Sequence, residues 1–208
     1  WEIKKKITLN EQTRGLSLVK EALRYAITRG GIMTYPAGIL AGFVRTRPEL
    51  ATPDVQYHIV HASFKDVKKR ILDKHPGMTI APCQMRPESR GSIHIKSLNP
   101  EDPPAIKGNF LAEENDQRTL VEGMKIAKRI AAAPALRDFV LKELNPNEEI
   151  RSDDELLNFA KERGNTVYHP VGTCKMGSDP NAVVDDRLRV IGMNSLRVVD
   201  ASVMPTLI

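Results

Sequence analysis

The residues best suited to chemistry lie near the end of the chain, where a histidine stands between a tyrosine and a proline. Residues 168–177 read Tyr-His-Pro-Val-Gly-Thr-Cys-Lys-Met-Gly. An imidazole changes its charge near neutral pH, so His169 can act as a general base and accept a proton from a substrate hydroxyl. Pro170 restricts the backbone of His169 to extended angles, which helps to aim the ring. The alternative is that this histidine is structural.

A second segment with features of a binding site occupies residues 196–205, which read Leu-Arg-Val-Val-Asp-Ala-Ser-Val-Met-Pro. The apolar run from Leu196 to Val199 predicts a strand, and the run ends abruptly at Asp200 and Ala201. A strand that stops at an acidic and a small residue suits a backbone that approaches a ligand closely. A plain turn after a buried strand is the alternative.

These two segments, together with Ala-Val-Val-Asp at residues 182–185, resemble the C-terminal end of the glucose–methanol–choline (GMC) family of FAD-dependent alcohol oxidoreductases. The three motifs follow one another in the order and at the spacing of that family. The similarity extends to Pro-Asp-Val-Gln-Tyr-His at 53–58 and to Arg-Pro-Glu-Ser-Arg-Gly at 86–91, and it is weaker over residues 1–52. The chain departs from the family at Ile-Lys-Gly-Asn, where members often have Ile-Asp-Pro, in a loop that we expect to be peripheral.

The resemblance implies a role for each candidate residue. His169 occupies the position of the family's catalytic base. Asp200 and Ala201 match the segment whose backbone amides meet the pyrophosphate and ribityl chain of FAD. Tyr168 is implied to lie close to the flavin or substrate, and a core aromatic residue is the alternative. His58 is implied to contact the substrate, as in some choline-oxidising relatives, and a buried core histidine is the alternative.

The function implied by the resemblance is that of an FAD-dependent alcohol dehydrogenase of the choline or general alcohol branch. Such an enzyme oxidises a primary alcohol by hydride transfer to flavin. The alternative is a non-catalytic substrate-binding or interaction module derived from the same family.

The main cofactor fold has no counterpart in this sequence. FAD binding of this type needs a Gly-x-Gly-x-x-Gly turn between a strand and a helix, and the chain has none. The family's second active-site residue, an Asn or a His, normally follows several residues beyond the position of Pro205. We therefore expect a C-terminal fragment that does not hold FAD by itself, with a small alcohol and the missing FAD-binding domain as its partners.

Composition supports a globular protein and excludes several other classes. The chain has 208 residues, of which 41% are hydrophobic and 27% charged, so it can bury a core. No apolar run approaches the ~20 residues of a membrane span. The net charge is +5, but the densest basic runs, at 4–6 and 68–70, lack the aromatic neighbours that stack on bases. We read them as solvated surface and expect no nucleic-acid partner.

The two cysteines, Cys83 and Cys174, fit neither a metal-ligand spacing nor a disulfide framework. We expect no metal site and reduced thiols, as in a bacterial-type cytoplasm or an organelle matrix, and of these we predict a cytoplasmic location. A homo-oligomer is left open.

Periodicity predicts the elements that must position these residues. A first helix at 10–29 has an apolar stripe of Leu16, Val19, Leu23 and Ile27. The further elements expected are strands at 55–64, 78–85 and 92–97, and helices at 66–74, 116–132, 134–144 and from Ser152 to Gly164.

The predicted fold class is α+β, with a mainly antiparallel sheet and helices packed on it, as in the GMC substrate-binding domain. The polar turn at 86–91 is too short for the crossover that parallel strands require, so we expect the flanking strands to pair antiparallel. By role, residues 1–165 are expected to form the substrate-binding domain. Residues 166–208 are expected to carry the catalytic segment and return toward the FAD-binding domain.

Overall fold

The chain divides into two units, each with its own internal contacts. The first, which we call the sheet unit, comprises Trp1–Gln84 and Arg118–Gly164, and the second, the C-terminal unit, comprises Met85–Gln117 and Asn165–Ile208. The computed structural model describes residues 1–36 and 38–207. The expected boundary between residues 165 and 166 divides the chain by role rather than by contacts, and it stays a prediction. Helices and antiparallel sheets together confirm the predicted α+β class.

The sheet unit is built on a three-stranded antiparallel sheet. Its strands, in spatial order, are β2 (Leu40–Val44), β3 (Val55–Val60) and β6 (Thr79–Gln84). Tyr57 of the central strand pairs with Gly42 on one side and with Pro82 on the other. Pro82 has no backbone N–H, and β6 tolerates it because it is an edge strand. The strands predicted at 55–64 and 78–85 are thus confirmed, although the first ends early, at Val60.

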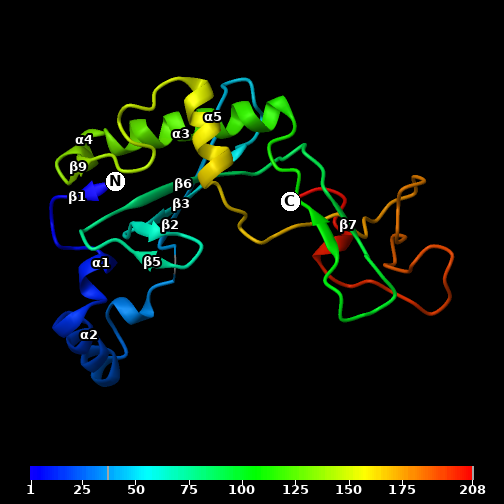
Figure 1. Cartoon of the computed structure of the whole chain (residues 1–208), viewed down its shortest axis with the longest axis horizontal. Coiled ribbons are helices and arrows are strands. Elements are labelled where there is room, and N and C mark those ends of the chain that lie inside the picture. Colours follow the sequence, from blue (N-terminus) through cyan, green and yellow to red (C-terminus); the bar gives the residue numbers. More distant parts are fainter. Residues whose placement is uncertain (37, 208) are drawn as a thin grey trace. The chain divides into compact units, whose positions relative to one another are not determined.

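Helix α3 (Glu114–Ala131) packs against this sheet, as predicted for residues 116–132 (Figure 1). Their shared buried core consists of Val55, Tyr57, Ile80, Ala127 and Ala131. The hydroxyl of Tyr57 donates a 2.7 Å hydrogen bond to the carbonyl oxygen of Gly123, and burial raises the pKa of Tyr57 to about 12. Small residues on this side of α3 let the helix approach the sheet closely enough for that bond.

Helix α5 (Asp153–Arg163) begins at the predicted capping box. The hydroxyl of Ser152 accepts the N–H of Glu155, and the carboxylate of Glu155 accepts the N–H of Ser152 at 3.0 Å. Leu156 and Ala160 are buried, so this helix also contributes to the core.

Two predicted helices are wrong, one wholly and one in part. Residues 66–74 form no helix, because β4 (Phe64–Asp66) and β5 (Ile71–Leu72) pair there as an antiparallel hairpin. The carboxylate of Asp66 accepts the N–H of Lys69 at 3.0 Å, and this bond closes a turn in place of a helical bond.

In the predicted helix 134–144, only α4 (Pro134–Arg137) is helical, and β9 (Val140–Lys142) follows it. Strand β9 pairs antiparallel with β1 (Glu2–Ile3). A partner from the other end of the chain therefore overrides the local helical pattern.

The predicted pairing of 78–85 with 92–97 is also wrong. Strand β7 (Ser92–His94) pairs instead with β8 (Ala105–Lys107), as a separate two-stranded antiparallel sheet in the C-terminal unit. Gly91 permits this approach, since an added Cβ would lie 2.1 Å from the carbonyl oxygen of Lys107. The strands of the chain thus form several small sheets and not one.

The first predicted helix is divided in two. Helix α1 (Leu9–Gln12) ends before Gly15, whose φ of +52° interrupts the helical path, and α2 (Gly15–Thr28) follows. A short 3₁₀ helix, η1 (Ile32–Thr34), comes next. No residue of α2 is buried, although its apolar stripe predicts a face turned toward a core.

The apolar run at 196–199 forms no regular strand. Arg197 makes a single antiparallel pairing with Arg189, and the N–H of Val190 donates to the carbonyl oxygen of Leu196 at 3.0 Å. The ladder stops there because the facing segment lies between two turns, one closed at Leu188 and the other at Met193. The short 3₁₀ helix η2 (Ala201–Val203) follows the run.

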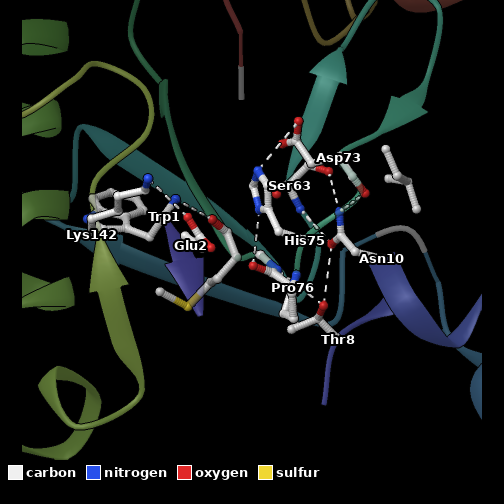
Figure 2. A network of polar contacts seen from close by, with 12 residues as sticks. Trp1, Glu2, Thr8, Asn10, Ser63, Asp73, His75, Pro76 and Lys142 are labelled. Atoms are coloured by element: carbon white, nitrogen blue, oxygen red, sulfur yellow. Dashed lines mark hydrogen bonds and ion pairs between the residues drawn. The ribbon is translucent and has the colours of Figure 1, made fainter. Parts of the chain in front are cut away.

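A buried amide ties α1 to the hairpin of β4 and β5 (Figure 2). Asn10 donates to the carbonyl oxygens of Ser63 and Asp73 at 2.8 and 3.0 Å and accepts the N–H of Ser63 at 3.0 Å. The hydroxyl of Thr8 accepts the N–H of Gly77 at 3.2 Å beside it. One side chain therefore binds three backbone groups at the open end of the hairpin, where Ser63 and Asp73 are also joined by a 3.0 Å backbone bond.

Within the described part of the chain, no helix is long and apolar enough to cross a lipid bilayer.

We expect Asn10→Ala to lower the free energy of unfolding of the sheet unit by about 2–4 kcal/mol, because buried backbone groups lose their partners. Urea unfolding followed by circular dichroism measures this. Asn158→Ala, at an exposed position of α5, is the matched control and should change stability by less than about 0.5 kcal/mol. Equal effects of the two variants would contradict the assignment.

Candidate active site in the C-terminal unit

His169 lies exposed in the loop that follows α5, beside an unusual backbone conformation. Tyr168 adopts a φ of +62°, in the left-handed region that residues other than glycine rarely occupy. Its N–H donates to the hydroxyl of Thr166 at 3.0 Å, and its own hydroxyl accepts from the side chain of Asn165 at 3.2 Å. Other non-glycine residues of the same unit, Leu188 and Ser195 among them, also have a positive φ, so the hypothesis of function at this loop rests on its motif and not on the backbone alone.

The loop is fastened to the segment that carries Asp200. The N–H of Cys174 donates to the carbonyl oxygen of Ser202 at 3.0 Å, and the N–H of Met176 donates to that of Val203 at 2.8 Å. Gly172, with a φ of +87°, turns the chain toward these bonds. The two motifs found in the sequence therefore lie side by side in the structure.

Asp200 caps η2 with its own carboxylate. Its Oδ1 atom accepts the hydroxyl of Ser202 and, at 2.8 Å, the N–H of the same residue. These two bonds, the hydroxyl one first, hold the pKa of Asp200 below its usual range. Because Asp200 and Ala201 are both exposed, the carboxylate and the turn are accessible to a ligand.

The Ala-Val-Val-Asp motif forms the support under these two segments. Val184 is fully buried, and the N–H of Gly177 donates to its carbonyl oxygen at 3.1 Å. Asp185 binds Arg189 at 2.6 Å, and this partner lowers the pKa of Asp185 to about 2. Lys175 pairs in the same way with Asp179 at 2.9 Å. The motif thus has a structural role in this chain.

Two residues with a positioning role escaped the sequence analysis. Asp116, almost fully buried in the first turn of α3, accepts the N–H groups of Glu88 and Ser89 at 2.9 and 2.8 Å. The hydroxyl of Ser89 accepts in return the N–H groups of Ala112 and Glu113 at 3.0 and 3.1 Å. These bonds shape the Arg-Pro-Glu-Ser-Arg-Gly turn. The serine of that motif is the only sequence feature that could have indicated them.

The same turn also reaches the end of the described chain. The guanidinium of Arg86 donates to the carbonyl oxygen of Leu207 at 3.3 Å. The backbone of residues 174–176 holds Ser202 and Val203, and Arg86 holds Leu207. The short segment between these points is therefore fastened at both ends.

The remaining predicted site residue, His58, belongs to the sheet unit. It lies half-buried in β3, where Ala41 and Ala81 are its neighbours in the adjacent strands. Strand alternation places it on the opposite face of the sheet from Tyr57. Its role toward a substrate stays a prediction, as do the roles of Tyr168, His169, Asp200 and Ala201.

Neither cysteine forms a disulfide, and burial raises the pKa of the Cys83 thiol. Among the described residues, no three His, Cys, Asp or Glu side chains are grouped so that they could hold a metal ion.

We expect Ser202→Ala to raise the pKa of Asp200 toward its ordinary value, because the variant removes the stronger of its two bonds. The side-chain carboxyl shift of Asp200, followed by NMR through acid titration, measures the change. Ser178→Ala, at an exposed position in the same unit, is the control and should leave the titration of Asp200 as it is. An unchanged titration in Ser202→Ala would exclude the hydrogen bond as the cause.

We expect Asp116→Asn to expose the amides of Glu88 and Ser89 to solvent exchange, because an amide oxygen cannot replace two carboxylate acceptors. Bonds to a charged group stabilise by about 1.5–3 kcal/mol, so exchange at both amides should accelerate roughly tenfold or more. Hydrogen-exchange NMR measures both sites. Asp186→Asn, at an exposed position, should leave them protected. Protection retained in Asp116→Asn would show that the turn holds without the carboxylate.

The fold and these loops define a class of α+β domain in which a His-Pro loop is hydrogen-bonded to an Asp-Ala-Ser turn. The family model described as GMC oxidoreductase matches residues 87–208. The chain therefore belongs to the GMC oxidoreductase family, as its motifs predict.

Its relatives include two kinds of dehydrogenase. The chain is 40% identical over 184 residues to the alcohol dehydrogenase (acceptor) of Pseudomonas putida, a match that covers 88% of this chain and 33% of the relative. It is 41% identical over 167 residues to the oxygen-dependent choline dehydrogenase of Cronobacter sakazakii, covering 80% of this chain and 30% of the relative. The chain thus spans about a third of the length of these relatives.

Solved structures share the fold. Pyridoxine 4-oxidase from Mesorbium loti matches 80% of this chain and 33% of its own with a TM-score of 0.71 at 26% identity. Formate oxidase from Aspergillus oryzae RIB40 matches 99% of this chain and 41% of its own with a TM-score of 0.82 at 24% identity.

Proposed function

We propose that this chain is the C-terminal part of an FAD-dependent enzyme that oxidises a primary alcohol, with His169 as its general base. The observation that carries the proposal is the pair of backbone bonds from Cys174 and Met176 to the Ser202–Val203 segment. Through these bonds the candidate base and the candidate cofactor turn belong to one local structure. The names of the relatives, alcohol dehydrogenase and choline dehydrogenase, support the choice of an alcohol as substrate.

In this mechanism, His169 removes the hydroxyl proton of the alcohol. An imidazole suits this step because its neutral form can accept a proton at a pH near neutrality. Loss of that proton raises the electron density on the carbinol carbon and favours departure of its hydrogen as a hydride. Pro170 restricts the backbone of His169 to extended angles, which helps to aim its ring at the substrate.

The residues present fit part of a flavin site. Asp200 and Ala201 offer an exposed turn whose carboxylate is held in its charged form, which can accept hydrogen bonds from the hydroxyls of the ribityl chain. When bound, FAD supplies the hydride acceptor. The phosphate-cradling glycine turn is absent from this sequence, so affinity for the cofactor must come from the FAD-binding part of a GMC protein.

Tyr168 and His58 are proposed to contact the substrate. Tyr168 is suited to this because it is 69% exposed and directly precedes His169 in the chain. His58 presents an imidazole on the sheet face opposite the buried core. The alcohol itself is proposed only as a class, since the two kinds of relative differ in the substrate that their names give.

The second candidate function is a non-catalytic substrate-binding or interaction module. The observation in its favour is exposure: His169, Tyr168 and Asp200 all face solvent in this chain, whereas catalysis by a base benefits from a site that excludes water. The two candidates differ in the behaviour of His169 when the enzyme is intact.

We expect His169→Ala to lower alcohol turnover by ~10²–10⁴-fold in the intact enzyme, while flavin absorbance stays unchanged. Turnover is measured with a primary alcohol and an artificial electron acceptor. His94→Ala, at an exposed position of β7, is the matched control and should retain full turnover. Full turnover in His169→Ala would refute its role as the base, and a flavin-free intact protein would favour the binding module.

A further inference from the structure

Helix α2 exposes its apolar side to solvent. Leu16, Val19, Leu23 and Ile27 recur every three or four residues and so form one stripe. Leu16 is 89% exposed and Ile27 is 81% exposed. A helix in a folded domain ordinarily buries such a stripe, so α2 has the reverse of the expected orientation.

The side of α2 that faces the protein is polar. The side chain of Glu21 is only 12% exposed, accepts the N–H of Ile32 at 3.4 Å and pairs with Arg24 at 3.8 Å. Tyr25 is half-buried on the same side. A helix of this length is marginal in water unless its apolar face is packed. The few polar contacts with η1 therefore leave α2 dependent on a surface that covers its stripe.

Exposed apolar residues are also found in the segment that follows the helix. The exposed large hydrophobic residues that follow along the chain are Met33, Tyr35, Ile39, Leu40 and Phe43. A hollow of about 660 Å³ lies between α2 and this segment, lined in part by Ile7, Arg24, Tyr35 and His61. We call the stripe of α2, these residues and the hollow the α2 surface. Exposed apolar surfaces that extend this far mark interaction sites.

The histidine that lines the hollow has one buried ring nitrogen. Nδ1 of His61 is buried and has no hydrogen-bond partner among the described residues. The ring of Tyr35 meets that of His61 edge to face at 5.7 Å, and burial lowers the pKa of His61, which favours its neutral form. An unsatisfied buried group costs about 1–3 kcal/mol. Because Nδ1 is closed to solvent, this unsatisfied nitrogen does not by itself select a partner for the α2 surface.

The charge around the α2 surface argues against a second copy of the chain. Residues 4–36 carry seven basic and two acidic side chains. Of the two acidic residues, Glu11 is bound in the capping box of α1 and Glu21 is turned inward. A symmetric pair would bring two such basic surfaces together. The complementary partner has an apolar centre and an acidic rim.

The lengths of the relatives point to the source of that partner. The fold of formate oxidase matches 99% of this chain, α2 included, yet the match covers only 41% of that protein. Most of a GMC polypeptide therefore lies outside the region that this chain represents. We propose that the α2 surface is a docking surface for this remaining part, which covers the stripe and the hollow. This proposal rests on the proposed function only in taking the intact enzyme to be a full-length GMC protein.

The test compares the 208-residue chain with a full-length chimera, in which this chain replaces the matched residues of the Pseudomonas putida alcohol dehydrogenase. Hydrogen exchange by mass spectrometry follows the peptide 15–28. We expect its amides to exchange roughly tenfold more slowly in the chimera than in the chain alone. Leu23→Glu should restore fast exchange in the chimera. Ser17→Glu adds the same charge to the same helix away from the stripe, and it should leave the protection intact.

Equal exchange of this peptide in the chimera and in the chain alone would overturn the proposal. Slow exchange in the chain alone that is lost on dilution would identify a second copy as the occupant. Protection of the chain alone by vesicles of phosphatidylcholine and phosphatidylglycerol, with none gained in the chimera, would identify a membrane surface. Both results also overturn the proposal.

A chimera that does not fold is replaced by co-expression of the tagged 208-residue chain with the remaining part of the same relative. Co-purification with wild type and with Ser17→Glu, but not with Leu23→Glu, supports the docking surface. Equal recovery with all three chains, or recovery with none, overturns it. Neither readout uses turnover, so the docking surface and the catalytic role of His169 can fail independently.

Discussion

Buried backbone groups must find hydrogen-bond partners, and in this protein polar side chains such as Asn10 and Asp116 supply them outside the regular ladders of sheet and helix. Asn10 does so in the sheet unit and Asp116 in the C-terminal unit. Both are almost fully buried, and both bind two or more backbone groups from a distant part of the sequence. The irregular connections that apolar packing cannot order are therefore ordered by single polar side chains.

Local patterns predicted the elements whose own sequence carries a clear period or cap. The apolar period of α3, the capping box of α5 and the alternation in β3 and β6 all identified real elements. Distant partners decided the elements that were missed. Val140–Lys142 is a strand because Glu2–Ile3 lies beside it, and Ser92–His94 pairs with a strand beyond the proline-rich loop. No short window of sequence contains that information.

The candidate site shows the same division. The motifs identified the segments around His169 and Asp200, and the structure joins these segments by backbone bonds. Asp116 was not found, because an acidic residue in the first turn of a helix is equally explained by its favourable interaction with the helix dipole. Only the three-dimensional structure reveals that its carboxylate faces the 88–89 backbone.

The left-handed conformation of Tyr168 limits how this loop can be re-engineered. In a mutational library at this position, residues that disfavour a positive φ would destabilise the loop, whatever their side chains do for activity. The left-handed region costs an ordinary residue roughly 1–2 kcal/mol and β-branched residues more, whereas glycine and asparagine enter it readily. A codon set restricted to Gly, Asn, Asp and the aromatic residues would therefore sample side-chain size beside His169 while keeping the loop in its present path.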